Sequence, residues 1–183
     1  MKKKIVILSL IGIIILFGGI WIGLRTFVYP IKYFDIIRQE CLKNHLDPYL
    51  ILAIIKSESG FNQNATSNKN AKGLMQLMDS TAQEVNEKEN NEESLEEDSI
   101  YDVELNISLG CKYFASLIQK YNGNYYLAIC AYNAGMGNVD KWIEEGIIPD
   151  DLEEYKEVDL PFNATSKYLQ KVVTSYKAYR ILY

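Results

Sequence analysis

Histidine and cysteine, which supply most ligands of transition-metal sites, are scarce in this sequence of 183 residues. His45 is the single histidine, and the three cysteines, Cys41, Cys111 and Cys130, show no paired metal-ligand spacing. We therefore expect no metal site and no cofactor. An odd number of cysteines leaves room for one disulfide, but the apolar, helix-like surroundings of Cys111 and Cys130 favour small buried side chains. We expect His45 to lie at the surface.

Recurrent strand-like alternation of apolar and polar residues is also missing, which predicts a mainly α fold with a single domain. Asp47 and Pro48 are typical of an N-cap followed by proline at the first helical position. We interpret Trp142 and Ile143 as the start of a connecting region that runs to Pro161. The apolar periodicity predicts helices at Tyr33–His45, Tyr49–Ser57, Val103–Tyr121, Tyr126–Tyr132 and Thr165–Tyr179, with a short one around Ser80.

An excess of positive charge is absent as well. The formal net charge is −5, and residues 26–183 hold 15 of the basic residues against all 24 acidic ones, about −9. Such a domain is not expected to bind nucleic acid. Much of the acidity lies between Glu84 and Glu104, which lacks an apolar period over most of its length, and we interpret it as a solvated, mobile loop. A metal site is the alternative, but the Asp-x-Asp-x-Asp-Gly spacing of a calcium loop is missing.

One long apolar run is present, the uncharged stretch from Ile5 to Leu24. Its length of about 20 residues suits a transmembrane helix and exceeds the roughly 7–15-residue apolar core of a signal peptide, which is the alternative. No Ala-x-Ala cleavage site and no lipoprotein cysteine follow the run. Three lysines before it against Arg25 after it predict that the N-terminus lies inside. We therefore expect a single-pass cell-membrane protein, with residues 1–25 as the N-terminal membrane anchor and residues 26–183 as the extracytoplasmic domain.

A single carboxyl group stands where an apolar helix ends. Glu58 follows the apolar run 51–55 and precedes Ser59 and Gly60. Partial desolvation disfavours the charged form of a carboxyl and raises its pKa, so Glu58 can stay protonated near neutral pH and act as a general acid. The alternative is a solvated surface glutamate, the usual state of this residue type. We expect Ser59 to cap or orient the turn.

Four motifs follow one another along the chain. Residues 58–62 read ESGFN, residues 73–78 read GLMQLM after a polar loop, and residues 131–135 read AYNAG. The last motif runs from Pro161 and Phe162 to the YLQKV of residues 168–172. In this order and spacing they resemble the lytic transglycosylases of the soluble-lytic-transglycosylase type, glycoside hydrolase family 23 of the lysozyme-like superfamily. The resemblance covers about residues 31 to 180.

The resemblance implies a lysozyme-like helical domain that acts on the glycan strands of peptidoglycan. Lytic transglycosylases use a single glutamate, which first protonates the oxygen that leaves N-acetylmuramic acid. The same glutamate, now a base, deprotonates the C6 hydroxyl of that sugar, which attacks C1 and closes a 1,6-anhydro ring. The N-acetyl carbonyl assists at C1, and no water is consumed. We therefore expect cleavage of the β-1,4 bond to N-acetylglucosamine with one carboxyl group.

Carried onto this sequence, the motifs place the catalytic role at Glu58. The resemblance implies substrate-binding roles for Ser67, Met75, Gln76, Tyr132, Asn133 and Tyr168. Tyr168 is expected to hydrogen-bond Glu58 and tune its proton affinity. Ser67 is expected to bond near the N-acetyl or peptide-bearing side of the substrate. Gly73 would let the backbone approach closely, because it has no Cβ.

The other implied residues have simpler alternatives. Met75 and Gln76 would line the cleft, yet Met75 could be a core residue at helical spacing. Tyr132 and Asn133 would hold the sugar or the glutamate, yet Asn133 could merely terminate a helix. Gln76 has no structural reason to sit in an apolar run, which favours a satisfied buried role or a ligand contact.

Two positions depart from the family pattern. Ala164 stands where many members carry a glutamate, so any support from that carboxylate is absent or supplied elsewhere. Asn70 stands where glycine is common, and asparagine tolerates left-handed backbone better than other non-glycine residues.

Two rival functions stay open. A hydrolytic muramidase on the same fold would need a second carboxylate, such as Asp79 or Asp102, across the cleft from Glu58. A non-catalytic glycan-binding component of a secretion or conjugation apparatus would bind strands without cutting them. The expected partners are peptidoglycan glycan strands and the cytoplasmic membrane, with cell-wall or secretion machinery as further candidates.

Overall fold

The structure is a computed structural model that describes residues 2–88, 95, 96, 98–152 and 160–183. Within these ranges there is no β-strand, only isolated bridges that join Lys72 to Thr66 and to Leu77. The predicted mainly α fold is confirmed. The helices in chain order are α1 (Lys2–Gly23), the π-helix η1 (Leu24–Val28), α2 (Phe34–Asn44), α3 (Pro48–Glu58), α4 (Asp79–Lys88), the 3-10 turn η2 (Ser99–Tyr101), α5 (Val103–Lys120), α6 (Tyr125–Ala134), α7 (Met136–Glu144) and α8 (Asn163–Leu182).

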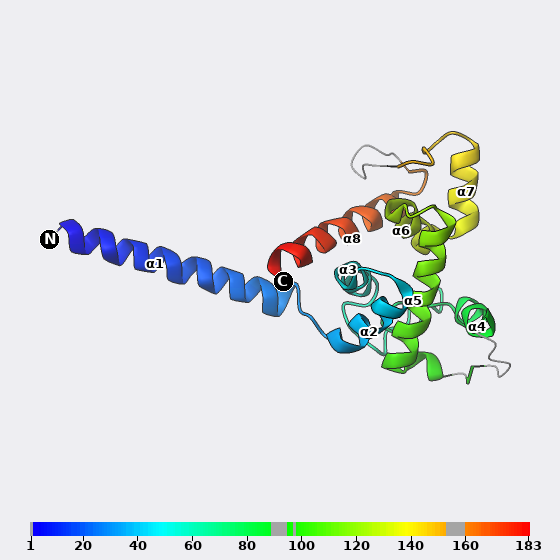
Figure 1. The fold of residues 1–183 in the computed structure, drawn as a ribbon, viewed down its shortest axis with the longest axis horizontal. Coiled ribbons are helices and arrows are strands. Elements are labelled where there is room, and N and C mark those ends of the chain that lie inside the picture. The colour runs from blue at the N-terminus through cyan, green and yellow to red at the C-terminus, as the bar shows by residue number, and fades with distance from the viewer. Residues whose placement is uncertain (1, 89–94, 97, 153–159) are drawn as a thin grey trace.

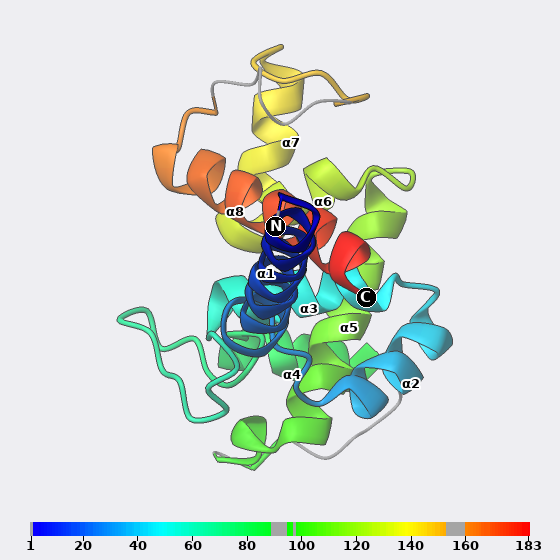
Figure 2. The same cartoon turned by 90° about the vertical axis from the view of Figure 1, so that its left-hand side faces the viewer.

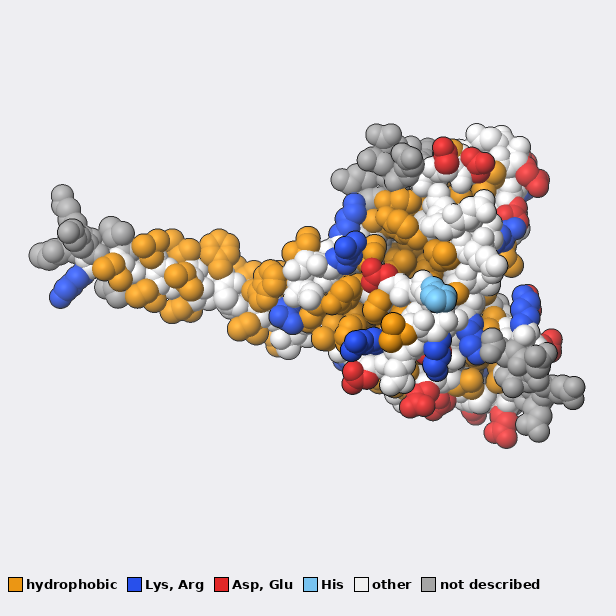
Figure 3. Space-filling view, viewed as in Figure 1, with side chains coloured by type: hydrophobic (Ala, Val, Ile, Leu, Met, Phe, Trp, Pro, Cys, Tyr) orange, Lys and Arg blue, Asp and Glu red, His pale blue; other side chains and the backbone are white. Residues whose placement is uncertain are grey.

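Helix α1 extends away from the other helices, which gather at one of its ends (Figures 1 and 2). Apolar side chains cover its surface in the space-filling view (Figure 3). In the described part of the chain, Ser9–Val28 is the one helical stretch long and apolar enough to cross a membrane, and none of it is buried inside the protein. A membrane anchor and a signal sequence both have these properties.

Helix α3 is the central helix of the domain. Its residues from Leu50 to Ile55 are all buried, because α8 packs along one side of the helix and α2 along another. A helix that is apolar all round is stable only when neighbours enclose it. Helix α6 packs against both α5 and α8. One continuous core is thus formed by α2, α3, α5, α6 and α8.

The predicted start of α3 is confirmed. Asp47 is the N-cap, and its Oδ1 accepts a hydrogen bond of 2.8 Å from the backbone N–H of Tyr49. Pro48 occupies the first turn, where a missing N–H costs nothing. The second carboxylate oxygen of Asp47 accepts a bond of 2.7 Å from the Tyr176 hydroxyl of α8, so the cap also joins the two helices.

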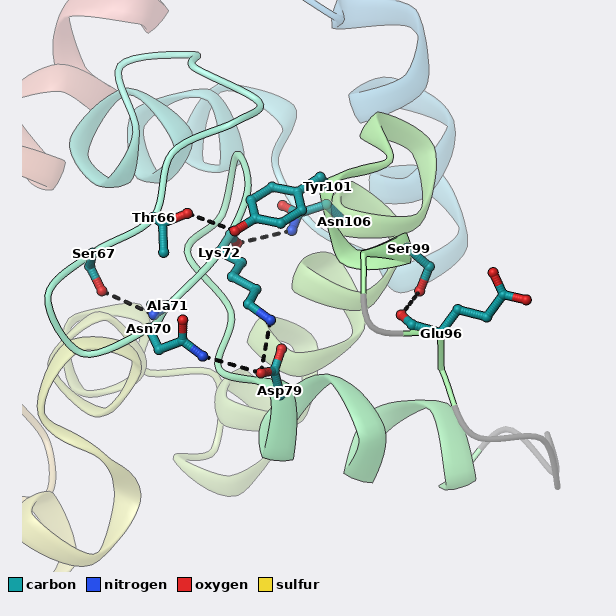
Figure 4. Close-up of polar contacts among 10 residues, drawn as sticks. All are labelled: Thr66, Ser67, Asn70, Ala71, Lys72, Asp79, Glu96, Ser99, Tyr101 and Asn106. Atoms are coloured by element: carbon teal, nitrogen blue, oxygen red, sulfur yellow. Dashed lines mark hydrogen bonds and ion pairs between the residues drawn. The ribbon is translucent and has the colours of Figure 1, made fainter.

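A long loop follows α3 and is fastened to α5 by the fully buried side chain of Asn106. Its amide accepts from the backbone N–H of Met75 at 2.8 Å and donates to the carbonyls of Lys72 (3.2 Å) and Ile100 (2.9 Å). Figure 4 shows how this and neighbouring polar contacts gather the loop beside α4. Gly73 lies against the same amide with φ +76°. The missing Cβ at Gly73 therefore lets the backbone approach Asn106 closely, while its role toward substrate stays a prediction.

Two expectations for the connecting regions are wrong. Trp142 and Ile143 do not begin a connection but lie inside α7, where Trp142 is buried and its ring meets that of Phe162 edge-on at 5.1 Å. The acidic stretch is helical at both ends. Its first residues belong to α4, whose buried Ala82 and Val85 give it an apolar face, and its last residues begin α5. Residues 89–94 and 97 of this stretch lie outside the described residues.

The cysteine prediction is confirmed. Cys41, Cys111 and Cys130 are free thiols, and all three are buried among apolar side chains. His45, expected at the surface, is exposed and ends α2 in a left-handed conformation. Asn70 also has a positive φ of 63°, so the residue that replaces the family's glycine keeps the left-handed turn.

Gly73→Ala should destabilise the protein more than Gly60→Ala. Both glycines have positive φ, so both substitutions strain the backbone. A Cβ at Gly73 would lie 2.2 Å from Nδ2 of Asn106, whereas a Cβ at Gly60 meets nothing within 4 Å. Overpacking of this kind adds about 1–3 kcal/mol. Denaturant unfolding of both variants measures the difference, and equal losses would contradict the assigned close contact.

Candidate active site

Glu58 is the last residue of α3, as the sequence predicted. Ser59 follows it as the C-cap: its Oγ donates to the Ile55 carbonyl at 3.3 Å and accepts from the backbone N–H of Phe61 at 3.2 Å. The expected capping role of Ser59 is confirmed. These bonds turn the chain sharply after Glu58 and direct it into the loop that carries residues 73–78.

The partner of Glu58 comes from α8. The hydroxyl of Tyr168 donates a hydrogen bond of 2.5 Å to Oε1 of Glu58, as the resemblance implied. Tyr168 is itself buried, and its hydroxyl orients the carboxyl. Buried tyrosine hydroxyls need such a partner.

Lys171 is a member of this site that sequence reasoning missed. Its Nζ donates a bond of 2.7 Å to the carbonyl of Ser57, one of the last carbonyls of α3 that lack an intrahelical partner. A cation at this position also complements the negative end of the helix dipole. The sequence signal was available, because Lys171 lies one turn after Tyr168 on the same face of α8.

The surroundings of Glu58 raise its pKa from 4.5 to about 7. Burial is the largest cause, since it disfavours the charged form. The hydrogen bond from Tyr168 and the positive charge of Lys171 act in the opposite direction and lower the pKa. Burial, assisted by the nearby charge of Glu58, raises the pKa values of Tyr132 and Tyr168 well above their usual range, so both hydroxyls keep their protons. Because its own pKa is about 7, the Glu58 carboxyl is close to half-protonated at neutral pH.

Tyr132 and Met75 meet beside Glu58. The Tyr132 hydroxyl donates to the carbonyl oxygen of Met75 at 2.8 Å, and its ring packs against that of Tyr113. Met75 was expected to line the cleft, but its exposed fraction is 0%. A Cβ at Gly110 would lie 2.3 Å from the Met75 sulfur, so the side chain fills the space that this glycine leaves on α5. Its side chain belongs to the core, and its carbonyl holds Tyr132.

Gln76 and Ser67 organise the loop. The amide nitrogen of Gln76 donates to the carbonyls of Ala65 (3.0 Å) and Gly73 (2.9 Å), which gives it the satisfied polar role that the sequence left open. The hydroxyl of Ser67 is at the exposed tip and accepts from the backbone N–H of Ala71 at 3.0 Å (Figure 4). Neither residue hydrogen-bonds Glu58, and their contacts with substrate stay predictions.

Asn133 joins α6 to α8. Its Oδ1 accepts a hydrogen bond of 2.9 Å from Oγ1 of Thr165, which is buried, while Asn133 itself is exposed. Helix α6 ends one residue later, and Gly135 supplies the positive φ of 88° after it. The motif therefore both ends α6 and fixes Thr165 in the first turn of α8, one turn before Tyr168.

The two carboxylates considered as partners of Glu58 have other contacts. Asp79 forms an ion pair of 3.0 Å with Lys72 at the start of α4, and Asp102 is the N-cap of α5, where it accepts from the backbone N–H of Leu105 at 2.9 Å. Among the described residues, no three His, Cys, Asp or Glu side chains gather as metal ligands would. A groove of about 640 Å³ between α2, α4 and α5 is lined by His45 and Tyr113 but not by Glu58.

A central apolar helix that packs against α2 and α8 and ends in a half-buried glutamate, bonded by a tyrosine of α8, defines a lysozyme-like all-α protein. The family model of the transglycosylase SLT domain matches residues 35–154, and the chain belongs to this family. Solved structures support the assignment. The lytic transglycosylase Slt of Pseudomonas aeruginosa, an inactive mutant, is 30% identical with a TM-score of 0.71 and aligns with 82% of this chain and 24% of its own.

The 70 kDa soluble lytic transglycosylase of Escherichia coli is 25% identical, with a TM-score of 0.75 over 84% of this chain and 25% of its own. A complex of a 70 kDa soluble lytic transglycosylase with bulgecin A matches with the same values. The chain thus spans about a quarter of the length of these solved relatives.

Glu58→Gln should change how stability depends on pH. Between pH values of about 4.5 and 7 the folded protein keeps a proton that the unfolded chain releases, so the free energy of unfolding falls as pH rises. The free energy of unfolding of the glutamine variant does not fall in this way. Above pH 7 the variant should therefore be more stable than the native protein by on the order of 2–3 kcal/mol, and below about pH 4.5 this difference should vanish. Denaturant unfolding across this range measures the difference. Glu144→Gln, on an exposed residue of α7, is the control, and equal behaviour of both variants would refute the assignment.

Tyr168→Phe and Lys171→Met should each raise the pKa of Glu58 further above about 7, since each removes an interaction that lowers it. Titration of the labelled carboxyl carbon by NMR measures the shift. Lys167→Met, one turn earlier on α8 and exposed, is the matched control and should leave the titration unchanged. A lower pKa in either site variant would contradict the assigned causes.

Proposed function

We propose that this protein is a peptidoglycan lytic transglycosylase that cleaves the β-1,4 bond between N-acetylmuramic acid and N-acetylglucosamine. The observation that carries the proposal is the half-buried Glu58 carboxyl, with a pKa of about 7 and a hydrogen bond from Tyr168. The proteins similar to this chain are lytic transglycosylases, and a glutamate-to-glutamine mutant of one of them is inactive.

In the proposed reaction, protonated Glu58 donates its proton to the glycosidic oxygen as the bond to C1 of N-acetylmuramic acid breaks. The carboxylate left behind then accepts the proton of that sugar's C6 hydroxyl, whose oxygen bonds to C1 and closes the 1,6-anhydro ring. The enzyme regains its starting protonation state. A pKa near the operating pH suits a group that must act as acid and then as base. The substrate's N-acetyl carbonyl assists at C1.

A single carboxyl is consistent with this chemistry and disfavours a hydrolytic muramidase. Hydrolysis with inversion or retention uses a second carboxylate within about 5–9.5 Å of the acid. Asp79 and Asp102, the two candidates, are engaged by Lys72 and by the backbone of α5. A carboxylate held as a cap or in an ion pair is poorly placed to activate water.

The remaining residues act around this step. Tyr168 orients the carboxyl, and Tyr132 and Asn133 hold the sugar. Gln76 lines the cleft while its amide fixes the loop, and Ser67 contacts the N-acetyl or peptide-bearing side. Met75 contributes through its carbonyl, because its side chain is enclosed.

We further propose that residues 1–25 are a membrane anchor and residues 26–183 the catalytic domain on the outer face of the cytoplasmic membrane. The support is the exposed apolar surface of Ser9–Val28, together with the three lysines at the N-terminal end of the chain. Glycan strands lie on that side, so the anchor places the enzyme beside its substrate. Cell-wall or secretion machinery is the proposed setting.

Glu58→Gln should reduce release of 1,6-anhydromuropeptides from purified cell walls by at least about 10²-fold, because the acid and base are lost together. Asp79→Asn and Asp102→Asn are the matched controls and should keep the anhydro product. Mass spectrometry of the released fragments measures both rate and product. Ordinary reducing ends as the main product would support the muramidase, and strand binding without any turnover would support the non-catalytic component.

A further inference from the structure

The C-terminal end of α8 holds the chain segment that leaves α1. The hydroxyl of Tyr183 lies 2.9 Å from the carbonyl oxygens of both Arg25 and Tyr29, and its single proton is shared between these two acceptors. The guanidinium of Arg25 lies 4.1 Å above the centre of the Tyr183 ring. A residue at the end of the chain is thus joined to the end of the apolar helix by polar and cation–π contacts.

A second tyrosine completes this clamp, which we define as Tyr179 and Tyr183 with residues 25–30. Tyr179 is fully buried, and its hydroxyl donates to the carbonyl of Pro30 at 3.0 Å. The ring of Tyr179 meets that of Tyr29 edge-on, with 5.4 Å between the ring centres. The ammonium of Lys56 lies 5.0 Å from the centre of the Tyr29 ring. The carbonyls at and just beyond a helix end need such partners, and here the C-terminal end of α8 supplies them.

The clamp leaves little free chain between the apolar helix and the domain. Helical structure continues through η1 to Val28, and α2 begins at Phe34. Residues 25–30 of this junction are bound by α8. The domain is therefore docked on the helix rather than tethered to it.

The surface around the clamp suits a bilayer interface. Tyrosine and tryptophan concentrate at the level of lipid headgroups, and the partly exposed Tyr29 and Tyr183 lie at the C-terminal end of the apolar stretch, about two turns beyond Trp21. Phe27 and Ile181 are 84% and 72% exposed there. Arg180 is exposed beside Ile181, and α8 contains no acidic residue although the chain is acidic overall. Figure 3 shows basic groups around this junction.

Helix α8 also connects this surface to the active site. Tyr168 precedes Tyr183 by about four helical turns, which at 1.5 Å per residue is roughly 22 Å. The distance between the junction and the Tyr168 hydroxyl that bonds Glu58 is therefore fixed by the length of α8. With a flexible linker between α1 and the domain, the distance of the active site from the bilayer would vary.

We propose that the clamp and the adjoining Phe27, Arg180 and Ile181 form one membrane-contacting surface that binds phospholipid headgroups and holds the active site at a short, fixed distance from the bilayer. The inference rests on the proposed membrane anchor. It also defines the substrate class as glycan strands that lie close to the membrane. Apolar Ile181 and Phe27 enter the interface, and Arg180 pairs with lipid phosphates.

The test uses the full chain in vesicles of phosphatidylcholine and phosphatidylglycerol that include lipids spin-labelled at the headgroup. A fluorophore is attached through Ile181→Cys or, as the matched control, through Ile147→Cys. Ile147 is also an exposed apolar residue and follows α7, the helix that lies on the side of the domain away from α1 (Figure 1). Buried cysteines should label little, and the protein without either substitution gives that background.

Two changes then separate docking from tethering. An insertion of about ten Gly and Ser residues after Ile31 lengthens the chain beyond the clamp. Arg25→Ala with Tyr179→Phe and Tyr183→Phe removes the hydroxyl and guanidinium contacts while keeping both rings for the core. With the clamp intact the insertion loops out, whereas with the clamp removed it adds a flexible reach of roughly 17 Å.

We expect strong quenching at position 181 and little at position 147. The insertion alone should leave the quenching at 181 unchanged, and insertion with the clamp substitutions should reduce it at least twofold. The proposal would be overturned if the insertion alone reduced the quenching at position 181 as much as the insertion with the clamp substitutions. It would also be overturned if the two changes together left the quenching unchanged. Weak quenching at position 181 in the otherwise native protein bound to the vesicles would overturn the surface, whereas failure of that protein to bind the vesicles would overturn the anchor.

Activity measured in the same vesicles separates this surface from the catalytic proposal. In the variant that combines the insertion with the clamp substitutions, release of 1,6-anhydromuropeptides from lipid-linked glycan strands should fall. Their release from soluble strands should be unchanged. Equal release from the two substrates in every variant would overturn the assigned substrate class. Normal quenching without cleavage of either substrate would count against the catalytic role of Glu58 and support the surface.

Discussion

The hydrogen bond between Tyr168 and Glu58 is the contact on which the arrangement of this protein depends. It joins the C-terminal end of the central helix α3 to the beginning of α8, in a place where burial makes an ionised carboxyl costly. Lys171 and Ser57 repeat the connection one turn further along. Because the two helices are joined here, the carboxyl is desolvated enough to keep a proton and still has a partner when it loses it.

The rest of the polar network positions what surrounds this carboxyl. The buried amide of Asn106 fastens the loop after α3 to α5, and Tyr132 reaches from α6 to the Met75 carbonyl of that loop. Thr165 and Asn133 set the start of α8. Each bond satisfies a backbone or side-chain group that would otherwise be buried without a partner, so fold stability and site geometry have the same physical origin.

Much of the fold was predictable because its signals are local. Apolar periodicity identified α2, α3, α5, α6 and α8, and Asp47 with Pro48 marked the start of α3. Helix α7 was missed because its single buried face, formed by Val139 and Trp142, is short and meets partners distant in sequence. At the site, the motif residues gave Glu58 and Tyr168, but the burial of Met75 depends on the space left by Gly110.

The sequence by itself determined the helical class, the apolar N-terminal stretch, the lone carboxyl at a helix end and the family motifs. These follow from residue type and short-range spacing, which a chain carries whether or not it is folded. Only the tertiary structure decided that Lys171 lies close to Glu58, that the pKa of Glu58 is about 7, and that Tyr179 and Tyr183 bind the segment after α1. Desolvation and long-range hydrogen bonds depend on distances between residues more than a hundred positions apart along the chain, and only packing sets those distances.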